Sequence, residues 1–294
     1  MRIHLVDGTY ELFRHHFAMP SHRNDADQEV AATRGVLGSL LMMLEEGGVT
    51  HLGVATDHVI ESFRNQMWAG YKTGEGIDPD LYRQFPLLEQ GLFAMGIMCW
   101  PMVEFEADDA LGAAAAVASV DERVRQVLIC TPDKDLAQCV EGERVVMLDR
   151  RHGTITDVAG VVAKWGVLPE SIPDYLGLVG DTADGYPGLK GWGAKSTGTV
   201  LASYGHIEDI PDDAAEWNVK VRGAAKLAET LRTQRADALL FREIATVRRD
   251  APVSSVDEMR WQGPTDDLPE LCRLLDRPDW IERVQRLAER SASI

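Results

Sequence analysis

Short apolar runs alternate with segments of helical periodicity over the first half of the chain. Four runs have the length and apolar content of buried strands: RIHLV at 2–6, HLGVAT at 51–56, IMCWPMV at 97–103 and RQVLICT at 125–131. Between them, segments such as 30–46 place apolar residues at the three- and four-residue spacing of a helix. Strands that alternate with helices predict an α/β fold, in which helices cover both faces of a mostly parallel central sheet.

The pattern changes in the second half of the chain. Residues 143–157 predict a hairpin, and the chain beyond them is mainly helical. No linker marks a boundary, but the change predicts an α/β domain over residues 1–165 and a helical region over residues 166–294. From about residue 252 we expect one short strand and helices, and we expect the terminal SASI, residues 291–294, to be frayed.

Acidic residues follow all four predicted strands. Ligand sites of parallel sheets lie outside the carboxyl ends of the strands, so we expect these side chains to meet at one edge of the sheet. The acids concerned are Asp7, Asp57, Glu106, Asp108, Asp109, Asp133 and Asp135.

Two explanations compete for these acids. Acids at the start of a helix complement the helix dipole, and Asp133 alone would most simply cap the segment that follows it. Alternatively, the acids bind a divalent metal, because Mg2+ prefers carboxylate oxygens. Glu106, Asp108 and Asp109 crowd three negative charges into four residues, which requires a positive partner. Acids that follow four separate strands are expected at the same edge of the sheet, which favours the metal site.

A glycine-rich stretch, GDTADGYPGLKGWGAKSTGTVLASYG, predicts a tight hairpin between two helices. Such a hairpin presents backbone N–H groups to a phosphate at the start of the second helix. The alternative is a helix-connecting turn without a ligand. The glycines and lysines that favour phosphate binding are Gly188, Gly191, Gly193, Lys190 and Lys195.

Two further aspartates, Asp181 and Asp184, lie just before this hairpin. Residues spaced by three can share one face of a helix. If the hairpin folds back to the sheet edge, these two carboxylates would complete the acidic set.

Composition limits how nucleic acid could be held. The net charge is −17, from 30 Lys and Arg against 47 Asp and Glu. This balance excludes binding by overall positive charge, so any nucleic acid would be held by local patches, with modest affinity that falls steeply as salt rises. No apolar segment resembles an export signal or a membrane span, so we expect a cytoplasmic protein that does not bind a membrane. The four cysteines lack metal-ligand spacing and are expected to be reduced thiols.

Taken together, these motifs resemble the bacterial 5′–3′ exonuclease and flap endonuclease family, including the N-terminal nuclease domain of DNA polymerase I. The resemblance covers nearly the whole chain. It rests on LVDGTYELFR, FEADDALG, TPDKDLAQ, GLVGDTADGYPGLKGWGAKS and ALLFREIATV, in this order. It implies a PIN-like nuclease fold with a helix-hairpin-helix (H3TH) DNA-binding region.

The resemblance also implies the site and its ligands. The substrate would be DNA with a 5′ flap, overhang or junction. It would be cut with two Mg2+ ions, for which Mn2+ can substitute. The protein is expected to be a monomer that acts in replication and repair. A K+ ion in the hairpin is implied as well. The nine acids named above would hold the divalent ions, with Asp108, Asp109, Asp133 and Asp135 as the inner ligands. Arg14, Arg64 and Lys72 would contact the reacting phosphate, and Lys195 the duplex.

Three features depart from the family pattern. A helical arch over about residues 62–86 usually carries basic residues, but after Lys72 it reads TGEGIDPD, and an acidic tip should repel a threaded strand. Gly185-Tyr186 replaces a polar and an aliphatic residue, which should alter local rigidity. No polymerase domain follows, so we expect a stand-alone member.

Two other functions stay open on the sequence. A metal-dependent ribonuclease of the related PIN class would share the sheet-edge acids but generally lacks the hairpin. A non-catalytic module could use the hairpin to bind branched DNA while the carboxylates are structural. The complete acidic set favours the nuclease over this module.

Overall fold

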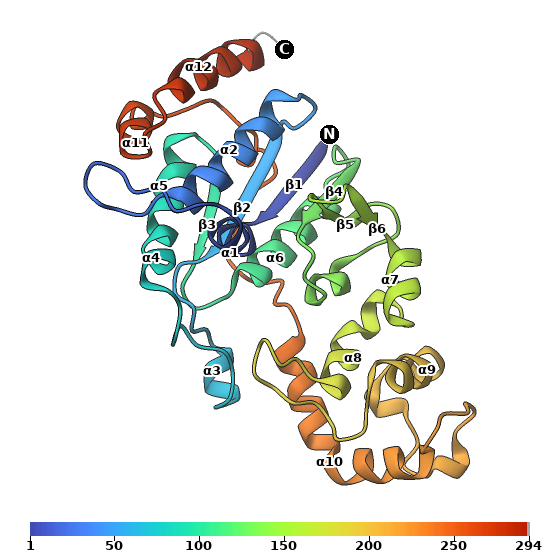
Figure 1. Cartoon of the computed structure of the whole chain (residues 1–294). Helices are drawn as coiled ribbons and strands as arrows, with labels where there is room; N and C mark the ends of the chain where they lie inside the picture. Colours follow the sequence, from blue (N-terminus) through green and yellow to red (C-terminus); the bar gives the residue numbers. More distant parts are fainter. Residues whose placement is uncertain (293–294) are drawn as a thin grey trace. The chain divides into compact units, whose positions relative to one another are not determined.

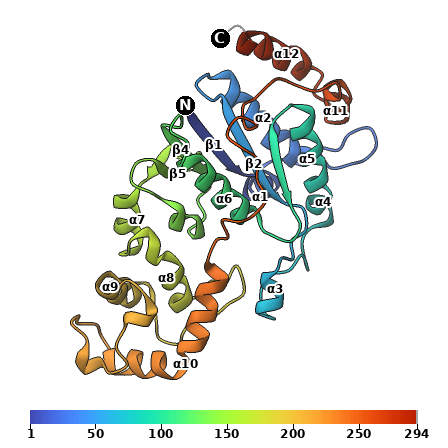
Figure 2. The same ribbon diagram turned by 180° about the vertical axis from the view of Figure 1, so that it is seen from behind.

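The computed structural model describes residues 1–292 and divides into two compact units (Figures 1 and 2). The first unit comprises Met1–Ile60, Gly74–Thr131 and the described chain from Arg249 onward; the second comprises Glu61–Thr73 and Pro132–Arg248. Of the four residues expected to be frayed, 291 and 292 belong to the last helix, and 293 and 294 lie outside the described residues.

The first unit is built on four parallel strands, as the apolar runs predicted. Their order is β3-β2-β1-β4, and Leu5 pairs with Gly53 on one side and with Ile129 on the other. Every residue of β2 is buried, which explains why its sequence is a continuous apolar run rather than an alternating one. The strands are β1 Arg2–Asp7, β2 His51–Asp57, β3 Met98–Met102 and β4 Gln126–Cys130.

Helices cover this parallel sheet. Connections between parallel strands are right-handed, so the change of direction after β3 places α6 on the opposite face from α2 and α5. Helix α6 packs on β1, β2 and β4, whereas α11 packs on α5 and α12 on α2. The helices of this unit are α1 Gly8–Ala18, α2 Ala31–Glu45, α4 Pro79–Tyr82, α5 Gln84–Ala94, α6 Ala107–Ser119, α11 Leu268–Leu274 and α12 Asp279–Ala292.

The second unit is mainly helical and contains one hairpin; its bounds differ from the helical region proposed over residues 166–294, because residues 61–73 and 132–165 belong to it and the described chain from Arg249 onward does not. Strands β5 Val145–Asp149 and β6 Thr154–Thr156 pair antiparallel, which confirms the predicted hairpin. Helix α8 packs against both α9 and α10 and forms the centre of the unit. The α-helices are α3 Arg64–Met67, α7 Val158–Trp165, α8 Ile172–Val179, α9 Ala194–Tyr204 and α10 Ala224–Ala245; the 3-10 helices are η1 Asp135–Cys139, η2 Pro169–Ser171, η3 Ile207–Asp209 and η4 Ala214–Glu216.

The strand expected after residue 252 is not formed in the described chain. Only an isolated antiparallel bridge between His51 and Arg260 occurs there. Two backbone hydrogen bonds flank it, from Leu52 to Met259 (2.9 Å) and from Trp261 to Thr50 (2.9 Å). The segment thus meets the start of β2 for only a few residues, too few to continue as a strand.

The predicted arch differs in detail from expectation. Its first helix, α3, ends at Met67, so Lys72 lies beyond it rather than on it. Its second helical part begins with α4 at Pro79, so residues 68–78 of the predicted arch are not helical. The acidic tip is partly neutralised, because Asp80 pairs with Arg83 (3.0 Å) and with Arg23.

Two remaining expectations concern the cysteines and membrane-spanning helices. All four cysteines are free thiols, and burial raises the pKa of Cys99 to about 12, so this thiol stays protonated at neutral pH. Among the described helices, none has the length and apolar character needed to cross a membrane.

Candidate metal centre and phosphate-binding hairpin

Two acids of the first unit end neighbouring parallel strands. Asp7 is the last residue of β1 and caps α1: its Oδ1 accepts the N–H of Tyr10 (2.8 Å), and its Oδ2 accepts the hydroxyl of Thr131 (2.9 Å). Asp57 ends β2, and its Oδ1 accepts the N–H of Ala107 (2.8 Å) at the start of α6. Both carboxylates therefore lie at the carboxyl edge of the sheet, where the strand pattern placed them.

The three crowded acids occupy the start of α6. Glu106 caps the helix, and its own N–H donates to Asp109 Oδ2 (3.0 Å) in a reciprocal capping box. Asp109 is fully buried, whereas Asp108 is half-buried in the first turn. Helix capping thus accounts for the conformation of two of these acids, as the competing explanation proposed.

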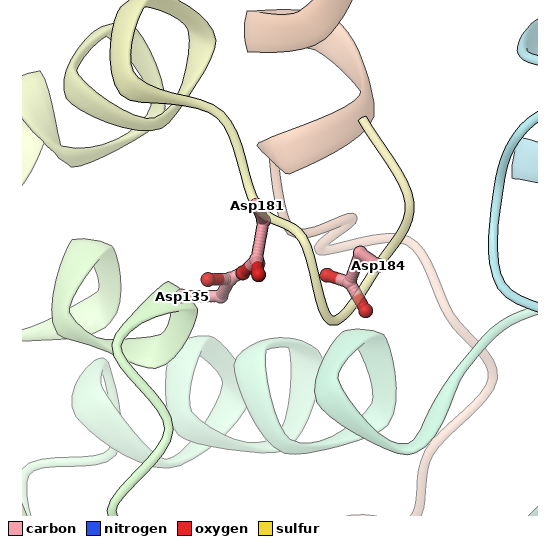
Figure 3. Close-up of side chains that lie close together, drawn as sticks. All are labelled: Asp135, Asp181 and Asp184. Atoms are coloured by element: carbon pink, nitrogen blue, oxygen red, sulfur yellow. The ribbon is translucent and has the colours of Figure 1, made fainter. Parts of the chain in front are cut away.

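Three acids of the second unit form a compact carboxylate cluster. Asp135, Asp181 and Asp184 each place an oxygen within 4.8 Å of the others (Figure 3). Asp135 comes from the start of η1, and the two other residues come from the turn that follows α8.

That turn corrects the expectation that Asp181 and Asp184 share a helical face. Helix α8 ends at Val179, and Gly180 follows with a φ of +83°, a conformation that favours glycine. An antiparallel bridge between Asp181 and Tyr186 then closes the turn with hydrogen bonds of 2.8 and 3.0 Å. The two carboxylates are brought together by this turn and not by helical spacing.

The cluster has an uncompensated buried oxygen. Asp135 is 7% exposed, and its Oδ1 has no hydrogen-bond partner among the described residues. Burial, together with the charges of Asp133 and Asp184, raises the pKa of Asp135 well above its usual range. Asp133 itself is exposed, and its Oδ1 accepts the N–H of Asp135 (2.9 Å), the capping role considered for it.

Two lysines face the cluster. The ammonium group of Lys72 lies 3.0 Å from Asp184 Oδ1, and that of Lys134 is bonded to Asp181. Burial opposes the charged form of Lys134, but its hydrogen bond to Asp181 and the neighbouring carboxylates leave its pKa raised. Sequence reasoning missed Lys134. The available signal was its position between two aspartates in TPDKDLAQ.

A divalent cation fits this donor set. The cluster offers only oxygen ligands, which suit Mg2+ and Mn2+, and the buried Oδ1 of Asp135 has no partner within the described part of the chain. The contacts of Lys72 and Lys134 with two of these aspartates show that lysine side chains already offset part of the negative charge of the cluster.

Both arginines that were expected near the reacting phosphate bind other groups of the protein. Arg14 on α1 pairs with the buried Glu11 one turn earlier. Arg64 is 3% exposed; its guanidinium donates to the carbonyls of Ile244 (2.8 Å) and Thr246 (3.1 Å) at the end of α10. Sequence proximity to Lys72 gave no sign of this burial.

The glycine-rich stretch forms a hairpin between α8 and α9, as predicted. Leu189 donates its N–H to the carbonyl of Leu178 (2.8 Å), which closes the hairpin against the end of α8. Gly193 is the N-cap residue of α9, Gly188 and Gly191 lie in the loop, and Lys190 and Lys195 are exposed. Backbone N–H groups at the start of α9 and two lysines are therefore available to an anion.

Comparisons with known proteins agree with this architecture. Residues 2–166 match the N-terminal resolvase-like domain of 5′-3′ exonucleases, and residues 167–267 match their C-terminal SAM fold. The chain belongs to the 5′-3′ exonuclease family. DNA polymerase I of Bacillus caldotenax is 35% identical to this family member over 289 residues, covering 96% of the chain and 32% of the polymerase. The chain thus spans about a third of that relative.

A shorter relative matches over most of its own length. The 5′-3′ exonuclease of Buchnera aphidicola is 30% identical over 252 residues, covering 85% of this chain and 82% of the relative. Among solved structures, zinc-bound T5 5′-exonuclease superposes with a TM-score of 0.66 at 15% identity, covering 98% of this chain and 99% of that one. The catalytic core of Rad2 with DNA substrate gives 0.62 at 16% identity, covering 97% and 92%. These two likenesses show that the fold is shared.

Proposed function

We propose that this family member is a structure-selective 5′ nuclease, a 5′–3′ exonuclease and flap endonuclease that hydrolyses DNA phosphodiester bonds. The proposal rests on the cluster of Asp135, Asp181 and Asp184. The turn that carries Asp181 and Asp184 leads directly into the glycine-rich hairpin. The second unit therefore contains both carboxylates that can bind a cation and a hairpin whose backbone N–H groups can bind phosphate.

The proposed cofactor is a pair of Mg2+ ions, for which Mn2+ can substitute. Such ions activate water and offset the negative charge that develops on the phosphate and on the leaving oxygen. The cluster would hold one ion through its carboxylates. The proposed metal-site acids are Asp7, Asp57, Glu106, Asp108, Asp109, Asp133, Asp135, Asp181 and Asp184.

Basic groups of the chain would bind and orient the substrate. Lys72 is 30% exposed at its side chain, and its ammonium can exchange Asp184 for a phosphate oxygen. Arg14 and Arg64 are proposed near the same phosphate, although Arg64 would first have to leave its buried carbonyl partners.

Duplex DNA would be held elsewhere on the second unit. The exposed Lys190 and Lys195, with the N–H groups around Gly193, offer contacts to successive backbone phosphates. A K+ ion held by carbonyl groups of this hairpin remains part of the proposal. We further propose DNA with a 5′ flap, overhang or junction as substrate, and a cytoplasmic monomer acting in replication or repair.

Cleavage of a 5′-labelled flap duplex with Mg2+ or Mn2+ tests the proposal. We expect cutting near the junction by the wild-type chain, none with EDTA, and about a thousandfold less with Asp135→Asn. Glu258→Gln, which alters an exposed carboxylate remote in sequence from the cluster, serves as the control. Binding without cutting would favour the branched-DNA module, and faster cutting of single-stranded RNA would favour the ribonuclease.

A further inference from the structure

Residues 68–72 lie against the turn that carries Asp184. The indole N–H of Trp68 donates to the carbonyl of Gly185 (3.1 Å), and the N–H of Lys72 donates to the carbonyl of Asp184 (2.9 Å). Two consecutive carbonyls of the turn are thus bound by one short segment of the predicted arch. All of these residues belong to the second unit.

A pair of glycines allows this close approach. Gly185 has a φ of +85°, and a Cβ built on it would overlap the carbonyl oxygen of Gly70. Any other residue at position 185 would both strain the backbone and push the two segments apart. The Gly185 that departs from the family pattern is therefore required by the contact with Gly70.

An aromatic stack supports the same contact from behind. The ring of Phe241 on α10 meets Trp68 edge-on, with centroids 5.1 Å apart, and lies nearly parallel to Tyr186 at 5.7 Å. Phe241 and Tyr186 are 3% and 1% exposed. One buried ring thus fixes the side chains on both sides of the Gly70–Gly185 contact.

Lys72 is held at several points by this arrangement. Besides its N–H, its carbonyl accepts the side-chain amide of Asn65 (2.9 Å), and its ammonium contacts Asp184 (3.0 Å). The position of the Asp184 carboxylate therefore depends on the segment that Trp68 ties to the turn.

We propose that Trp68 is a positioning residue for Asp184, and that it keeps this carboxylate within reach of Asp135 and Asp181. Trp68 acts through the carbonyl of Gly185 and the ring of Phe241. The inference rests on the proposed metal-dependent function. Residues that orient metal ligands typically contribute about 10- to 100-fold to metal affinity.

Mn2+ binding to the full chain, measured by calorimetric titration, tests this role separately from catalysis. Trp68→Phe keeps the ring against Phe241 but removes the N–H donor, so we expect the Mn2+ dissociation constant to rise about 10-fold with the melting temperature nearly unchanged. Gly185→Ala should have a larger effect. Cleavage by Trp68→Phe should fall at limiting Mn2+ and return at saturating Mn2+.

Two variants serve as matched controls. Trp100→Phe removes a comparable indole hydrogen bond, to Ser254 (3.2 Å), in the first unit. Gly47→Ala introduces a side chain at a φ of +82° with no atom within 4 Å of the new Cβ. Neither should change Mn2+ affinity.

Each outcome decides the inference. Unchanged Mn2+ affinity in Trp68→Phe, or an equal loss in Trp100→Phe, overturns it and leaves the proposed nuclease standing. A wild-type chain that binds Mn2+ but cuts no DNA overturns the nuclease, while the titration still decides the role of Trp68. A wild-type chain that binds no Mn2+ overturns both.

Discussion

The acids Asp181 and Asp184 of the second unit contact lysine ammonium groups, and Asp181 also accepts a backbone N–H, whereas the contacts described for the first-unit acids are with backbone N–H and hydroxyl groups. In the first unit, Asp7, Asp57 and Asp109 accept backbone N–H groups at the starts of α1 and α6. In the second unit, Asp181 and Asp184 contact the ammonium groups of Lys134 and Lys72. A backbone N–H is fixed by its helix, whereas a lysine side chain can move away. The comparison teaches that helix starts hold the carboxylates of the first unit in place, whereas movable lysine side chains contact those of Asp181 and Asp184 in the second.

The largest effect should follow from removing the buried acid of the second unit. Asp135→Asn should reduce Mg2+-dependent cleavage by about a thousandfold, because a bound ion contributes several kcal/mol to transition-state stabilisation. In EDTA the same variant should melt at a higher temperature than the wild type, since it buries one potential charge fewer. Cleavage assays and calorimetry with EDTA measure the two effects. A lower melting temperature would show that Asp135 is structural.

The matching substitution in the first unit, Asp57→Ala, should lower stability in EDTA, whereas Asp135→Asn should raise it. Asp57→Ala leaves the N–H of Ala107 without its acceptor, and losing such a cap costs about 1 to 2 kcal/mol. We expect a lower unfolding free energy in urea titrations with EDTA present. If Asp57→Ala and Asp135→Asn shifted stability in the same direction, the contrast between the two groups would be lost.

The role of the mobile cations is tested by Lys134→Met. Without metal, Asp181 loses its ammonium partner, so the melting temperature in EDTA should fall. With Mn2+ present, the variant no longer repels the ion. Repulsion between the single charge of an ammonium and the double charge of Mn2+ about 4 Å apart in water is worth about 2 kcal/mol, so Mn2+ should bind about 30-fold more tightly. Weaker Mn2+ binding by Lys134→Met would instead make the lysine a positioning group.

The smallest effect concerns an ion pair of the second unit outside the cluster. His206 donates a hydrogen bond to the carboxylate of Asp174, which raises the pKa of the imidazole above its usual value, so this pair adds stability below about pH 6.5 and loses it as pH rises through the raised pKa. Because the His206 side chain is 47% exposed, solvent screens the pair, and we expect it to contribute at most about 1 kcal/mol. The melting temperature of the wild type minus that of His206→Gln should therefore shrink from about pH 5.5 to pH 8. This difference should be the same with EDTA and with Mn2+; a metal-dependent difference would link the pair to the cluster.

Strand-end acids were predictable because chain order and parallel pairing determine where a strand stops. Asp7 and Asp57 accordingly lie at the predicted edge. The turn at Asp181 was not predictable from a spacing of three, because it depends on the positive φ of Gly180 and on pairing with Tyr186.

Partners distant in sequence explain the other surprises. Arg64 contacts Ile244, 180 residues away, and no local pattern announces such a contact. Lys134 binds Asp181, 47 residues further along the chain, and no local pattern indicates this pairing. Local periodicity specifies elements, whereas these contacts depend on how α10 and the turn after α8 pack.

The first unit is assembled from three separate stretches of chain, and this has a consequence for biosynthesis. Its last stretch supplies α11 and α12, which pack on α5 and α2, and Trp280 of α12 is fully buried. A ribosome must therefore finish the whole second unit before the first can close. Until then the apolar faces of α2 and α5 stay open to chaperones and to aggregation. A nascent chain stopped near residue 248 would carry every proposed site residue and still lack a completed first unit.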